Sequence, residues 1–187
     1  MKRLLGIATG IDALLAFFAR IGGWFGAVLV LVVCYDVITR YFGVPKPFGL
    51  NSTMIQESEY WLHSYLIVLV VGYAYVRNAH VRIDLVRDLT STRVKCWIEA
   101  IGIVLLLVPY SILGLWLAWP YMMQSFQQGE ISKSQNGLSH IWLLKGGLMV
   151  LFLLLFLAAV SQLIKAISGI IGTPPDGFAG ISDGEDA

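Results

Sequence analysis

Four long runs of apolar residues, separated by short polar segments, dominate the pattern of this chain. They cover residues 21–39, 60–76, 100–119 and 146–164. A helix needs roughly 20 mostly apolar residues to cross the hydrocarbon core of a bilayer. The second run is short and needs its flanking residues to span. The pattern therefore predicts an all-α membrane protein with four transmembrane helices.

The flanking segments predict short amphipathic helices at the membrane surface. Within residues 1–20, apolar side chains recur at helical spacing (Leu4, Ile7, Ile11, Leu14, Leu15 and Phe18), which indicates an interfacial helix before the first span. Residues 81–89 divide into a charged and an apolar side in the same way. We thus expect an interfacial N-terminal segment at 1–20, a four-helix membrane domain at 21–168, and a disordered acidic tail at 169–187.

Local signals place some of the helix boundaries. Thr53 and Gln56 match a capping box, so a helix is predicted to begin near residue 54 and to continue into the second span. Glu57 and Glu59 then lie near the positive end of that helix, where acids are favourable. Pro109 lies inside the third run and is expected to kink it, because proline donates no backbone hydrogen bond.

Composition supports a membrane protein, and the distribution of charge sets its orientation. The mean hydropathy is +0.74 and 13% of residues are charged, against about a quarter in soluble domains. The net charge of +1 indicates no nucleic-acid partner. Nine basic residues fall in the two tails and the middle connection (Lys2, Arg3, Arg20, Arg77, Arg82, Arg87, Arg93, Lys95 and Lys165), and four fall in the other two connections. Because basic residues favour the cytoplasm, both termini are predicted to be cytoplasmic.

Few residues offer chemistry. Asp36 precedes Arg40 by one helical turn, so a local ion pair is sufficient to explain this acid. His63 and His140 lie near the same side of the membrane, and two histidines from different helices can hold a haem iron. A b-type cytochrome that anchors an oxidoreductase is therefore an alternative. No catalytic, metal-binding or phosphate-binding motif occurs in the sequence, so we expect neither an enzyme nor a bound cofactor.

The segment that follows the second run reads GYAYVRNAHVRID. Together with the Glu-containing helix start and the aromatic second run, it resembles the small membrane subunit, of the DctQ type, of tripartite ATP-independent periplasmic (TRAP) transporters. The matching positions are Gly72, Arg77, His80, Val81 and Asp84. The resemblance covers about residues 21–164. An unrelated four-helix scaffold protein is a further alternative.

The resemblance implies a place in the bacterial inner membrane and a role in transport. A periplasmic solute-binding protein would deliver an organic acid, often a carboxylate, to a large sodium-coupled subunit of the elevator type. The small subunit would carry no substrate or sodium site, and would brace the immobile scaffold of the large one among the membrane lipids. The residues we expect at this interface or in its support are Arg77, His80, Asp84, Glu57, Glu59, Gly22 and Gly26.

Overall fold

The computed structural model describes residues 2–46, 49–79, 90–134 and 137–172. All regular elements in these ranges are helical. They are α1 (Lys2–Tyr41), α2 (Ser52–Val76), α3 (Thr92–Gly102), the π-helix η1 (Ile103–Leu107), α4 (Val108–Gln127) and α5 (Ile141–Ile171). The prediction of an all-helical membrane protein is confirmed at this level.

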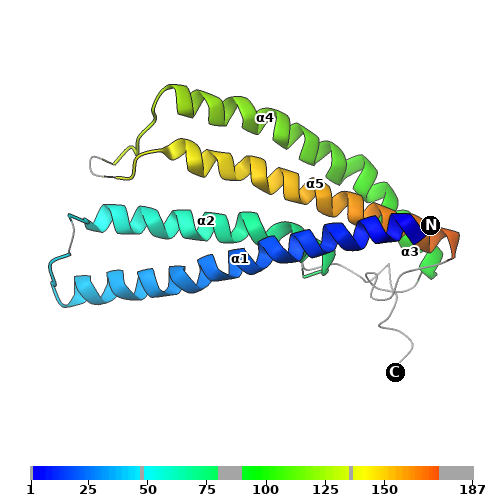
Figure 1. The fold of residues 1–187 in the computed structure, drawn as a ribbon, viewed down its shortest axis with the longest axis horizontal. Helices are drawn as coiled ribbons and strands as arrows, with labels where there is room; N and C mark the ends of the chain where they lie inside the picture. Colours follow the sequence, from blue (N-terminus) through cyan, green and yellow to red (C-terminus); the bar gives the residue numbers. More distant parts are fainter. Residues whose placement is uncertain (1, 47–48, 80–89, 135–136, 173–187) are drawn as a thin grey trace.

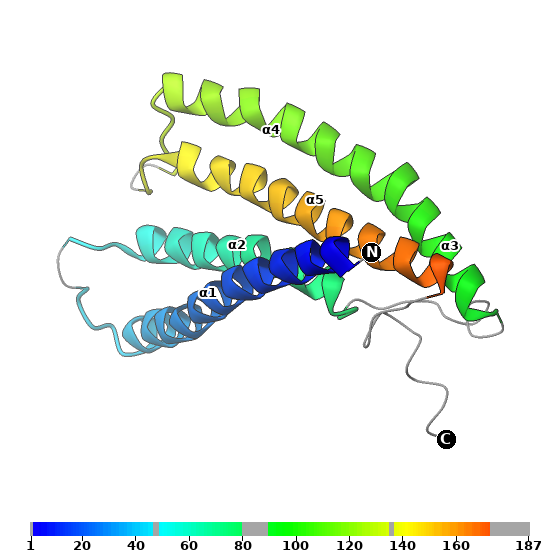
Figure 2. The same cartoon turned by 45° about the vertical axis from the view of Figure 1, so that its right-hand side comes forward.

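The long helices form two antiparallel hairpins, α1–α2 and α4–α5, that lie side by side (Figure 1). The end of α1, the start of α2, the end of α4 and the start of α5 lie at one end, which we call the loop end. The N-terminus and α3 lie at the other end, which we call the α3 end. Helix α5 is central, because it contacts α1, α2, α3, η1 and α4. Within the described ranges α4 contacts only η1 and α5, so α4 is an outer helix (Figure 2).

Helix α1 joins two segments that the sequence pattern separates. The interfacial helix expected over 1–20 and the span expected from residue 21 form one helix of 40 residues. At 1.5 Å per residue it extends over about 60 Å, roughly twice the thickness of a bilayer core. The helix does not break at Gly22 and Gly23, because a glycine inside a helix costs only about 1 kcal/mol.

The start of α2 corrects the expected capping box. The helix begins at Ser52, and the N-cap is Asn51, whose Oδ1 accepts a hydrogen bond from the backbone N–H of Met54 at 2.7 Å. This bond satisfies one of the N–H groups left free at the first turn. Thr53 is thus already inside the helix and cannot cap it.

The third apolar run contains a π-helix directly before its proline. The backbone N–H of Val108 bonds the carbonyl of Ile103, five residues earlier, and Pro109 opens α4. Widening this turn accommodates a residue that has no N–H and whose ring would clash with the preceding turn. The simple kink expected at Pro109 is therefore a π-bulge, and α3, η1 and α4 together arch over α5 (Figure 2).

The core lies where α1, α2 and α5 meet. Its buried side chains are Leu15, Val68, Leu69, Val76, Leu154 and Ala158. Gly72 is the point of closest approach, since a Cβ there would lie 2.9 Å from the Leu154 carbonyl oxygen and 3.0 Å from Cδ2 of Leu15. Small residues allow membrane helices to approach in this way.

Among the described residues, three helices are long and apolar enough to cross a membrane: Lys2–Tyr41, Thr92–Gln127 and Ile141–Ile171. The second of these runs through α3, η1 and α4 without interruption. Helix α2 is not among them by composition, since its first three turns carry Glu57, Glu59 and His63. Helix α5 ends at Ile171, past the start of the tail expected from residue 169, and residues 173–187 lie outside the described ranges.

Candidate functional site

An ion-pair cluster closes the α1–α2 hairpin at the loop end. Asp36 is 3% exposed and pairs with Arg40, as the spacing predicts. It also receives the ammonium group of Lys46, with Nζ 2.6 Å from Oδ1. Lys46 donates a second bond to the hydroxyl of Ser52 at 3.0 Å. Lys46 therefore fastens the connection to Asp36 of α1 and to Ser52 of α2.

Glu59 faces this cluster from α2. Its Oε1 atom is buried and has no hydrogen-bond partner in the described part of the chain. It lines a cavity of about 500 Å³ together with Asp36 and Arg40. The two carboxylates are balanced by Arg40 and Lys46, so the cluster is nearly neutral. No group of three His, Cys, Asp or Glu side chains that could hold a metal ion occurs among the described residues.

Glu57 joins the two hairpins at the loop end. One carboxylate oxygen accepts a hydrogen bond from the Ser132 hydroxyl, and the other accepts one from the backbone N–H of Leu138 at 2.5 Å. Gly137 leaves room for this contact, because a Cβ there would lie 2.5 Å from Oε1 of Glu57. The Ser132 bond, followed by that of Leu138, lowers the pKa of Glu57 below its ordinary value. Sequence reasoning placed this acid at a helix start but did not find its partners.

These bonds predict a pH-dependent contribution of Glu57 to stability. A carboxylate whose pKa is lowered on folding stabilises the fold above its unfolded pKa, and this stabilisation disappears as the pH falls through the folded pKa. We expect wild type to unfold at a higher temperature than Glu57→Gln at about pH 7, and the difference to close below about pH 4. Thermal unfolding of both purified proteins across this range measures it. A constant difference at all pH values would contradict the assignment.

A second ion pair links the end of α4 to the start of α5. The ammonium group of Lys145 lies 2.5 Å from Oε2 of Glu130 and 4.1 Å from the centre of the Tyr121 ring. The bond from Lys145 lowers the pKa of Glu130. This pair holds the loop 128–140 against the hairpin, beside the segment that Glu57 binds.

The motif residues Arg77, His80 and Asp84 follow α2 in the chain, and only Arg77 is among the described residues. Arg77 is the C-cap residue of α2, and its side chain is exposed. His80 and Asp84 lie outside the described residues. The last carbonyl of α2, at Val76, accepts a hydrogen bond from the side-chain amide of Gln162 at 2.9 Å. Gln162 is 2% exposed, so a buried polar residue of α5, which sequence reasoning missed, binds the last carbonyl of α2.

A second cross-link at the α3 end ties α1 to α5. Asp12 pairs with Lys165, with Oδ2 and Nζ 2.5 Å apart, and accepts a hydrogen bond from the Ser161 hydroxyl at 2.5 Å. The Nε of Arg93, from α3, donates to the carbonyl of Ile170 at 3.1 Å. The arrangement is therefore two polar ends joined by apolar helices, with side-chain bonds across each end. Such bonds hold the helices in register.

Comparison with known proteins agrees with this arrangement. The DctQ component of the tripartite ATP-independent periplasmic transporters is a family whose model matches residues 29–169, about three quarters of the chain. The chain belongs to the DctQ family. It is thus a transporter component, and the family is not one of enzymes. Neither the curated proteins nor the solved structures give a match.

Membership in the DctQ family implies association with the other TRAP components, such as the large membrane subunit and the binding protein. Gly22 and Gly26, the glycines expected at an interface with the large subunit, contact α2 of this DctQ chain instead. A Cβ on Gly22 would lie 2.9 Å from Cγ2 of Val70, and one on Gly26 would lie 3.4 Å from Leu66. Both therefore serve the packing of α1 on α2. Gly23, by contrast, has no atom of the described chain within 4 Å of such a Cβ.

The two histidines of the haem alternative are both exposed in this DctQ chain. His63 lies on α2, and His140 is the N-cap residue of α5, in the left-handed conformation (φ 67°). The ring Nδ1 of His140 lies 2.7 Å from the hydroxyl of Ser139. A haem site buries two ring nitrogens that face each other across one iron, and nothing in the environment of these histidines favours that alternative.

Proposed function

We propose that this DctQ chain is the small accessory subunit of a sodium-coupled TRAP transporter in the bacterial inner membrane. The transporter imports an organic acid, typically a carboxylate. A periplasmic solute-binding protein delivers this acid to the membrane subunits. In this proposal the chain braces the scaffold of a large elevator-type subunit. The family match carries the proposal.

The position of the charged residues supports an accessory role. The sequence has no charged residue between Arg20 and Asp36 in α1, between Glu59 and Arg77 in α2, between Glu99 and Glu130 through α4, or between Lys145 and Lys165 in α5. Transporters commonly bind their anion and coupling ion near mid-depth, where half-helices end. The centre of this chain supplies no charge for such a site.

The shape of the helix layer supports bracing. Helices α1 and α4 are outer helices, and both present large apolar side chains (Trp24 and Leu31 on α1, and Trp116 on α4, each about 70% exposed). An arrangement with α4 packed outside the group formed by α1, α2 and α5 occupies more of the bilayer plane than a compact bundle of the same helices. Attached to a fixed scaffold, it would resist the drag of a domain that moves through the lipid.

The proposed topology has four spans, with α2 as the fourth, and both termini in the cytoplasm. It rests on the unequal distribution of basic residues and on the antiparallel hairpins. A periplasm-only reporter fused after Ala187 should be inactive, whereas one fused after Lys46 should be active. Reporter activity in cells, normalised to fusion-protein abundance, makes the measurement. The opposite pair of results would invert the topology.

We further propose that Arg77, His80 and Asp84 form a cytoplasmic corner that supports assembly. Arg77 follows α2 at the end where a cation is favourable, and the spacing of His80 and Asp84 allows one hydrogen bond between them. Each exposed contact contributes on the order of 1 kcal/mol or less. Single variants should therefore insert normally and lose several-fold in co-purification with the large subunit.

Co-purification from membranes tests both the corner and the subunit assignment. Wild type should be retained by a tagged large TRAP subunit of the same organism, and His80→Ala and Asp84→Ala should be retained less. His63→Ala is the matched control, because it removes an exposed histidine at the other end. If His80→Ala and Asp84→Ala are retained as well as this control, the corner serves only to fix the topology. Absence of wild-type retention would count against the accessory role itself.

A further inference from the structure

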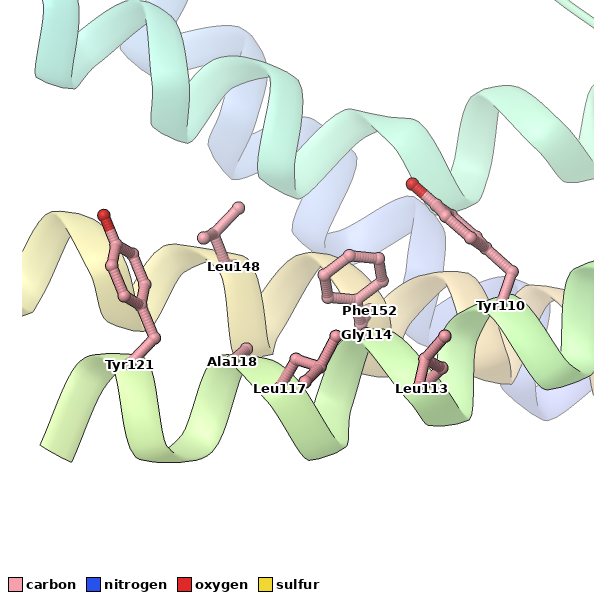
Figure 3. A pocket seen from close by; sticks show the side chains of 8 residues that line it. All are labelled: Tyr110, Leu113, Gly114, Leu117, Ala118, Tyr121, Leu148 and Phe152. Carbon is pink, nitrogen blue, oxygen red and sulfur yellow. The ribbon is translucent and has the colours of Figure 1, made fainter.

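An apolar groove runs between α4 and α5 (Figure 3). Tyr110, Leu113, Gly114, Leu117, Ala118 and Tyr121 line it from α4, and Leu148 and Phe152 line it from α5. Its floor is a close approach of the two helices, since a Cβ on Gly114 would lie 2.4 Å from the Phe152 ring. Tyr110 packs edge-to-face on that ring, with centroids 5.5 Å apart.

The length of the groove corresponds to one leaflet. From Tyr110 to Tyr121 the α4 axis rises about 16 Å, at 1.5 Å per residue, and half of a bilayer core is about 15 Å thick. Tyr110 lies at the middle of the apolar helix Thr92–Gln127, and Tyr121 lies near its end. The groove therefore runs from the middle of the membrane to one surface.

The volume fits a thin occupant. The groove is open along one side and has a volume of about 420 Å³. A transmembrane helix about 10 Å wide fills roughly 1,300 Å³ over the same length, so a helix could place only part of one face in the groove. A single hydrocarbon chain can lie in it along its whole length.

The surface end of the groove carries a positively charged group. The Lys145 ammonium lies over the Tyr121 ring at 4.1 Å. Glu130 neutralises one charge there, and Lys133 is close enough to act on Glu130 electrostatically. Glu57 of α2, bound to Ser132 and Leu138 of the same loop, balances the second ammonium group. The Lys145 ammonium has three N–H donors, and Glu130 accepts one of them, so another can bind a lipid phosphate.

We propose that this groove binds one acyl chain of a phospholipid, with the lipid phosphate beside Lys145. The chain contacts Leu113, Leu117 and Leu148, and its end lies near Tyr110. The proposal requires that α4 and α5 span a bilayer and does not depend on the transport role. The proposed lipid is retained in the groove. It differs in this from the lipids that contact any exposed apolar surface, such as the outer face of α1.

Photo-crosslinking tests the proposal. The full-length chain is reconstituted into vesicles containing a phospholipid with a diazirine in its acyl chain, illuminated, and mapped by mass spectrometry. Adducts on the groove residues of α4 should exceed those around Trp24 and Leu31 on α1 several-fold. Equal labelling of the two surfaces would overturn the proposal, because it would show ordinary lipid contact only.

Matched variants locate the site. Leu148→Trp, which fills the groove, should remove the groove adducts, and Leu153→Trp, an exposed position on the same helix, should retain them. Leu117→Trp replaces the first variant if that protein fails to fold. Lys145→Gln should lower labelling more than Lys145→Arg.

The same map distinguishes other occupants. Groove adducts that persist in Leu148→Trp would overturn the proposal. Loss of wild-type adducts on addition of the large subunit, with crosslinks between its helices and α4, would assign the groove to a partner helix. Crosslinks between two copies of this chain, without lipid adducts, would assign it to self-association. Either assignment would also overturn the lipid site.

Discussion

Proteoliposomes that contain only this DctQ subunit will accumulate no organic acid when a sodium gradient is applied. The described helices are continuous through their centres except for the single π-bulge at Ile103–Leu107, and no charged residue lies at mid-depth to bind an anion or sodium. Uptake of a radiolabelled carboxylate, measured with and without the gradient, should equal that of protein-free vesicles.

The full system provides the positive control for this prediction. Vesicles that also contain the large membrane subunit, with the solute-binding protein added outside, should accumulate the substrate of that binding protein. Gradient-dependent uptake by the small subunit alone would contradict an accessory role and require a substrate path within these helices. If the large subunit takes up substrate equally well with and without this chain, the proposed bracing function is wrong.

Gly72→Leu will prevent normal folding of the isolated chain. A Cβ at this position meets the backbone of α5 and the side chain of Leu15 within about 3 Å, so three helices have to separate to admit a larger residue. Overpacking a core costs about 1–3 kcal/mol and occasionally more, and this contact involves backbone that cannot rotate away. The folded fraction after detergent extraction, measured by size-exclusion chromatography, should fall severely.

Gly23→Leu is the matched control, with the same change of residue in a neighbouring helix. A Cβ at Gly23 meets nothing within 4 Å, and leucine favours helix more than glycine does. This variant should be as monodisperse and as thermally stable as wild type, or slightly more stable. If both variants behave alike, the close approach at Gly72 does not hold α1, α2 and α5 together.

The helices were predictable because a bilayer imposes one length and one composition on every span. The residues at which α1 and α2 begin and end were less predictable from the sequence. Residues 1–20 have an amphipathic pattern suited equally to a membrane surface and to packing, and the ion pair of Asp12 with Lys165 favours packing on α5. Asn51 competed with Thr53 as a cap, and both residue types suit that position.

The polar contacts divide by their separation in the chain. Asp36 and Arg40 are one turn apart, so helix geometry alone brings them together, and the sequence predicted that pair. The partners of Glu57 lie 75 and 81 residues away, and Lys165 lies 153 residues from Asp12. One sequence contains no information on which helices are neighbours, so those contacts could not be derived. Gln162 did offer a signal, as a lone amide in an apolar run, because buried amides need partners.

The central position of α5 determines the order in which this protein can mature. Because α5 follows α1, α2, α3 and α4 in the chain, these four helices are synthesised before their common partner. The α1–α2 hairpin can already pair through Gly22, but α4 has no other long helix among the described elements to contact. A nascent chain paused before Ile141 therefore exposes the Gly72 surface of α2 and an unpaired α4 to the insertion machinery. The core between α1, α2 and α5 is therefore completed only when α5 enters the membrane.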